Sequence, residues 1–70
     1  MKLIEKTERY KIVRVKHPTD ITRAYDIKHS IDGRFFYRER HNGFLVSCKW
    51  VKTSYKRLVS LGILREGERI

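Results

Sequence analysis

The fold can be inferred from residues 24–50, AYDIKHSIDGRFFYRERHNGFLVSCKW, in which two turn dipeptides separate three β-rich runs. Asp32-Gly33 and Asn42-Gly43 are among the commonest sequences at the tips of tight β-hairpins. The runs that they separate, residues 25–30, 34–41 and 44–50, are similar in length. This pattern predicts a three-stranded antiparallel meander.

The register of the meander follows from asking which turns produce one clean apolar face, because a one-residue slip exchanges the two faces of a strand. The second turn, taken as two residues, pairs His41 with Phe44. The first turn gives a clean face only with three residues and Gly33 in the left-handed bulge position, which pairs Ile27 with Tyr37. The expected apolar face holds Tyr25, Ile27, Phe35, Tyr37, Phe44, Val46, Cys48 and Trp50.

The same register predicts a basic opposite face. Arginine dominates its middle strand, and the planar guanidinium fork suits phosphate groups and base edges. Phe36 lies among these cations as an exposed ring that could stack on a base. This face is expected to hold Lys28, Ser30, Arg34, Phe36, Arg38, Arg40, Leu45, Ser47 and Lys49, with Asp26 at one corner.

Two more elements are predicted outside the meander. Residues 10–16, YKIVRVK, are β-branched and aromatic, and their two mixed faces suit an edge strand; residues 2–6 extend this strand or pair with it. After Trp50 the apolar spacing becomes helical, which predicts a helix over residues 52–61 with Thr53 or Ser54 as its N-cap and Gly62 at its end.

These elements predict an α+β fold, with a three- to four-stranded antiparallel sheet and one C-terminal helix packed on one face. The helix is expected to cover the apolar face of the meander, with Cys48 pointing inward and Trp50 wedged between sheet and helix. With 70 residues, the chain forms one small domain, residues 1–70, which buries only about 60% of the surface that its unfolded form exposes.

Composition points to an anionic partner. The 17 Lys and Arg residues outnumber the 8 Asp and Glu residues, which gives a formal net charge of +9. A hydrophobic fraction of 40% is too high for an intrinsically disordered tail. The excess charge therefore favours binding to nucleic acid or to an acidic protein surface. A membrane partner is not expected, because no exposed apolar helix face accompanies the basic residues.

The sequence also indicates a compartment. One cysteine cannot form an internal disulfide, and the amino terminus lacks the apolar core of a secretory signal. No apolar run approaches the roughly 20 residues of a membrane span. We therefore expect a cytoplasmic, intracellular protein.

Catalysis is not expected. His29 and His41 would lie near opposite ends of the sheet, so they cannot share a metal ion with Cys48. An inward-facing thiol in apolar surroundings is typically inert. No two carboxylates have a spacing typical of acid–base catalysis or metal binding, and no glycine-rich phosphate loop is present. We expect no enzymatic activity, no catalytic residues, no metal site and no cofactor.

The favoured function is binding of nucleic acid by a small basic protein. DNA is preferred over RNA because a basic three-stranded sheet opposite a helix is similar in shape to plant AP2-type and integrase arm-type DNA-binding domains, although no family motif is present. The binding residues are expected to be Lys28, Arg34, Phe36, Arg38, Arg40 and Lys49 on the sheet, with Lys52, Lys56 and Arg57 on the outward side of the helix.

An alternative function uses the same basic face. In it, the chain is a small phage-type or mobile-element modulator that binds and regulates or inhibits a host protein, with Phe36 and Leu45 as interface anchors. The amino-terminal edge strand would also suit formation of a homodimer.

Overall fold

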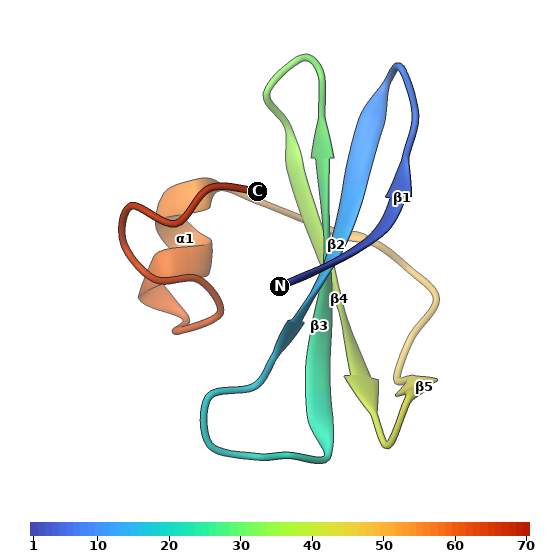
Figure 1. The fold of residues 1–70 in the computed structure, drawn as a ribbon, viewed down its shortest axis with the longest axis vertical. Coiled ribbons are helices and arrows are strands. Elements are labelled where there is room, and N and C mark those ends of the chain that lie inside the picture. Colours follow the sequence, from blue (N-terminus) through green and yellow to red (C-terminus); the bar gives the residue numbers. More distant parts are fainter.

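The computed structural model describes all of residues 1–70 and shows an antiparallel sheet with one short helix near the C-terminus (Figure 1). The elements are β1 (Lys2–Lys6), β2 (Tyr10–Lys16), β3 (Arg23–Ser30), β4 (Phe35–His41), β5 (Phe44–Leu45), β6 (Val51–Thr53) and α1 (Tyr55–Ser60). The strand order is β1-β2-β3-β4-β5, and β6 also pairs with β4. The sheet is strongly curled and has more strands than the three to four expected. No helix has the length and apolar character needed to cross a membrane.

The hairpin between β3 and β4 confirms the predicted register. Ile27 lies opposite Tyr37, and the turn contains Gly33 at a φ of +89°. The Ser30 amide donates to the Arg34 carbonyl at 2.9 Å and closes the turn. Because that φ is strained for any residue with a side chain, Gly33 permits the three-residue turn that sets both faces of the sheet.

The prediction of one strand over residues 44–50 is wrong after Leu45. His41 pairs with Phe44 as expected, but Val51 rather than Cys48 lies opposite Tyr37. The chain leaves β4 after β5 and returns as β6 with the pairing offset by three residues. An odd offset exchanges the faces, so the residues of β6 lie on the opposite sides from those that a continuous strand would give them.

This interruption overturns the expected positions of Cys48 and Trp50. Cys48 is exposed, and Trp50 lies over the Arg38 guanidinium on the basic side of the sheet instead of wedging sheet against helix. The physical reason is that later residues fill the core. Ile63 and Leu64, which follow the helix, are only 6% and 3% exposed.

The second strand, β2, is not at the edge of the sheet. It lies between β1 and β3, with Val13 opposite both Leu3 and Ile27. The turn before β2 is held by Thr7, whose hydroxyl accepts hydrogen bonds from the amides of Arg9 and Tyr10 at 3.2 Å. The edge role that was predicted for residues 10–16 therefore belongs to β1.

The helix is shorter than predicted because β6 extends to Thr53. Ser54 has an extended backbone, and its hydroxyl accepts from the Arg57 amide at 3.2 Å, which identifies it as the N-cap. Gly62, at a φ of +77°, follows the last turn as expected. Lys52 consequently lies in β6, not on the helix.

The core lies on one face of the sheet. It is formed by Val13 of β2, Ile27 of β3, Leu58 of α1, and Ile63 and Leu64 of the C-terminal segment. Leu58 is the one helix residue that is fully buried. The helix and the C-terminal segment thus cover the face that carries Ile27, and the other face of the sheet has no helix against it.

Candidate functional site

The face of the sheet opposite the helix, here called the helix-free face, is strongly basic. Strand pairing places residues on this face in rows, such as Arg14, Asp26 and Arg38 across β2, β3 and β4. Its charged members are the basic residues Lys2, Arg14, Lys16, Lys28, Arg38, Arg40 and Lys52 and the acidic residues Glu5 and Asp26. Seven positive and two negative charges leave a net charge of +5 on this face.

A buried carboxylate lies at the centre of the helix-free face. Asp26 has no exposed surface, and three arginine side chains donate their Nε–H groups to it. Arg14 Nε lies 2.8 Å from Oδ1, while Arg38 Nε and Arg40 Nε lie 3.0 and 2.8 Å from Oδ2. We call these four residues the Asp26 cluster. Asp26 was expected at a corner of the face, but the addition of β2 beside β3 makes it central.

The three arginines keep the Asp26 carboxylate ionised. Burial raises its pKa, but the hydrogen bonds from Arg14, Arg40 and Arg38 outweigh burial, so the pKa lies below the ordinary value. The cluster therefore contains one negative and three positive charges.

Acid should destabilise the fold by protonating the Asp26 carboxylate. Because the pKa of Asp26 is lower in the folded protein than in the unfolded chain, its contribution is present above about pH 3.9 and is lost as the pH falls through the folded value. Urea denaturation between pH 7 and pH 2 should show the difference in unfolding free energy between wild type and Asp26→Asn narrowing in acid. If the difference in unfolding free energy did not change with pH, the conclusion that Asp26 is ionised would be contradicted.

Aromatic rings surround Lys28 beside the cluster. The Lys28 ammonium lies 4.5 Å from the centroid of Tyr10, 5.7 Å from that of Trp50 and 5.9 Å from that of Phe36. The Trp50 ring also lies 4.2 Å from Cζ of Arg38. These distances are typical of cation–π contacts. Phe36 is half-buried in this arrangement, whereas the sequence suggested a freely exposed ring.

The structure divides the predicted binding residues into two groups. Lys28, Phe36, Arg38, Arg40 and Lys52 share the helix-free face. The others lie around it or behind it: Arg34 at the β3–β4 turn, where its Nε lies 3.2 Å from Oδ2 of Asp32, Lys49 in the irregular stretch before β6, and Lys56 and Arg57 on the helix. Arg38 and Arg40 are each only 18% exposed, because they pack around Asp26.

Sequence reasoning missed three basic residues of this face: Lys2, Arg14 and Lys16. The signal was present, because Tyr10, Ile12, Arg14 and Lys16 alternate along β2 on one side. These residues alone do not indicate that β2 pairs with β3, which brings Arg14 opposite Asp26.

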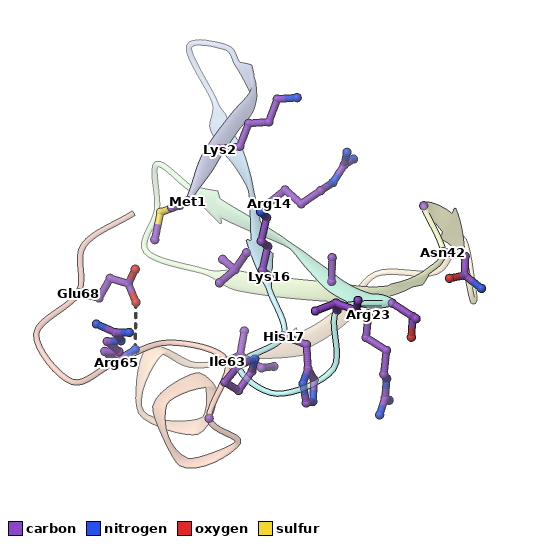
Figure 2. Close-up of a pocket in the computed structure, with 17 residues that line it drawn as sticks. Met1, Lys2, Arg14, Lys16, His17, Arg23, Asn42, Ile63, Arg65 and Glu68 are labelled. Carbon is purple, nitrogen blue, oxygen red and sulfur yellow. Dashed lines mark hydrogen bonds between the residues drawn. The ribbon is translucent and has the colours of Figure 1, made fainter.

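A broad hollow of about 1000 Å³ lies where the β2–β3 loop, the β4–β5 turn and the C-terminal segment meet (Figure 2). Its basic lining side chains do not converge. In Figure 2, Lys2 and Arg14 point away from His17 and Arg23. Arg23 is also paired with Glu39, at 2.8 Å. The hollow therefore offers no common point at which these cations could hold one ligand.

The histidines and the cysteine are dispersed. His17 Nδ1 accepts from the Asp20 amide at 2.9 Å, and His29 stacks on Phe35 with ring centroids 4.1 Å apart. No group of three or more His, Cys, Asp or Glu residues is placed to hold a metal ion. The chemistry concentrated on this molecule is that of its arginines and lysines.

Comparison with family models, with curated proteins and with solved structures found no match to this chain. Function is therefore inferred from the geometry and charge of the helix-free face.

Proposed function

We propose that this chain is a small, non-enzymatic nucleic-acid-binding protein that contacts the polymer through its helix-free face. The observation that carries the proposal is the net charge of +5 on this one side of the sheet, which persists although Asp26 and Glu5 lie among the basic residues. A surface of one sign attracts a polyanion and releases its condensed counterions.

The basic residues would take different roles in binding. Lys16 and Lys52 form no salt bridge in the structure and would supply flexible phosphate contacts. Lys28 also forms no salt bridge and would supply its contact from a fixed place among three aromatic rings. Arg34 and Lys49 are exposed at the margin of the face and extend it. Lys56 and Arg57, on the helix, contribute to the electrostatic attraction at longer range. Duplex DNA is the favoured polymer, because a β-sheet can lie in its major groove and read base edges there.

Binding should depend steeply on salt. Neutralising about five phosphates predicts a slope of log K against log salt near −4.5 on duplex DNA, or about a 500-fold loss between 50 and 200 mM salt. Fluorescence anisotropy with a labelled duplex measures this slope. Lys28→Gln should reduce its magnitude by about 0.9, whereas Lys56→Gln on the helix removes the same charge and should change it less.

Two outcomes would count against the proposal. Absence of binding to any DNA or RNA at low salt would refute it. Equal effects of Lys28→Gln and Lys56→Gln would show that overall charge, not the helix-free face, attracts the polymer.

A second candidate function is favoured by the exposed apolar residues that follow the β4–β5 turn. Phe44 and Val46 are 78% and 61% exposed, and Leu45 lies beside them opposite Arg40. Exposed apolar side chains next to arginines are typical of protein interfaces. Under this proposal the chain is a modulator that binds an acidic host protein. A partner that is retained from nuclease-treated lysate and lost with Phe44→Ser would support it.

A further inference from the structure

We propose that Arg14, Arg38 and Arg40 form a discrete binding site for a phosphate group, and that Asp26 is the positioning residue that orients them. The inference rests on the proposed function for the source of the phosphate, which would be the backbone of the nucleic acid. A small phosphate ester offers the same chemistry and is distinguished from the backbone by the experiment below.

The arginines of the Asp26 cluster have many more hydrogen-bond donors than the protein uses. Each guanidinium has five N–H donors, so the three together have fifteen. Four of these have a partner within the chain: the three Nε–H groups on Asp26, and one on Nη1 of Arg40, which donates to the Gly43 carbonyl at 2.8 Å. Eleven donors therefore remain.

The five Nη atoms of the cluster that have no partner reach solvent. The one buried side-chain nitrogen or oxygen atom without a partner in the structure is Thr53 Oγ1, so each guanidinium nitrogen is either bonded or in contact with solvent. Because every arginine binds Asp26 through Nε, the Nη edges are the groups left for a ligand. The two Nη atoms of one guanidinium can donate two parallel hydrogen bonds to a phosphate.

The electrostatics of the cluster also favour an anion. One carboxylate balances only one of the three guanidinium groups, so a charge of +2 stays concentrated within hydrogen-bonding distance of a single side chain. The Arg38 and Arg40 side chains are 18% exposed and Arg14 is 32% exposed, so water screens this charge incompletely. A neutral structural cluster would need one arginine, not three.

The site is already ordered without a ligand. Asp26 has no exposed surface and lies in the middle of the sheet, and it fixes Nε of all three arginines. The Trp50 ring also restricts Arg38, because the ring centroid lies 4.2 Å from Cζ of the Arg38 guanidinium. Holding long side chains in place before binding reduces the entropy that the ligand would otherwise cost them.

The test uses inorganic phosphate as the probe, with chloride adjusted to keep the ionic strength constant. Trp50 is the only tryptophan of the chain, so its fluorescence reports on the surroundings of Arg38. Arginine Nε–H signals in ¹H–¹⁵N spectra of the wild type give a second readout that needs no substitution. We expect saturable changes in both. Their absence would overturn the proposal.

Two matched variants test whether phosphate binds at a specific site or is attracted only by the overall positive charge of the protein. Arg14→Lys keeps the positive charge but removes the planar guanidinium group. It should weaken phosphate binding about tenfold, which corresponds to the loss of one charge-assisted hydrogen bond. Arg23→Lys is the control, because Arg23 also pairs with a carboxylate, that of Glu39 at 2.8 Å, but does not belong to the helix-free face. It should change the affinity by less than about twofold. Equal losses in the two variants would contradict the site.

Adding nucleic acid distinguishes this inference from the proposed function. A short DNA duplex that displaces phosphate from wild type, and binds Arg14→Lys more weakly, supports backbone phosphate as the ligand. Phosphate binding without duplex binding would refute the proposed function and leave the site, with a small phosphate ester as its ligand. Duplex binding that is equal in wild type and Arg14→Lys would refute the site and leave the function.

Discussion

Asp26→Asn should lower the free energy of unfolding by about 3–5 kcal/mol, because removal of one partner from a buried ionic network leaves the others uncompensated. The substitution nearly preserves the shape of the side chain, so the loss would reflect charge and hydrogen bonding. Three guanidinium groups would then face each other around a neutral amide. Urea denaturation followed by circular dichroism measures the change.

Asp32→Asn is the matched control for this prediction. Asp32 also forms an ion pair with an arginine, with its Oδ2 3.2 Å from Nε of Arg34, but its side chain is 52% exposed. Exposed ion pairs contribute about 0–1 kcal/mol, so this variant should be nearly as stable as the wild type. Similar losses in the two variants would mean that the Asp26 cluster does not hold the sheet together.

Leu58→Ala should destabilise the protein by about 2–5 kcal/mol, which is a large part of the stability of a domain of this size. Leu58 has no exposed surface and joins α1 to Val13 and Ile27 of the sheet. Truncation would remove the single fully buried contact that the helix makes. We expect a large shift in the urea midpoint.

Leu61→Ala makes the same chemical change three residues later. Leu61 is 49% exposed, and surface substitutions of this kind usually change stability by less than about 0.5 kcal/mol. If Leu58→Ala were as mild as Leu61→Ala, the helix would not be docked on the sheet through Leu58.

Local sequence determined the parts of the fold that were predicted correctly. Gly33 and the Asn42-Gly43 pair set the two hairpin turns, and with them the pairing of Ile27 with Tyr37 and of His41 with Phe44. Ser54 and Gly62 likewise mark the ends of the helix through their own hydrogen bonds and backbone angles. Each of these signals involves residues close together in the chain.

The errors concern contacts between distant residues. Nothing in residues 44–50 shows that the strand breaks, because these residues alternate as a strand should; the break depends on Ile63 and Leu64 filling the core instead of Trp50. The Asp26 cluster was missed in part for the same reason. The β3–β4 register placed Asp26 on one face with Arg38 and Arg40, but Arg14, 12 residues before Asp26, joins them only through the pairing of β2 and β3.

The order of strands in the sheet has a consequence for how the chain folds. From β1 to β5, every strand pairs with its neighbour in sequence, so each pairing closes only a short loop. The entropy of loop closure is therefore small at each step, so these strand pairings can form early in folding. Leu58, Ile63 and Leu64 come last in the chain, so a growing polypeptide can pair its first five strands before the residues that complete its core have been synthesised.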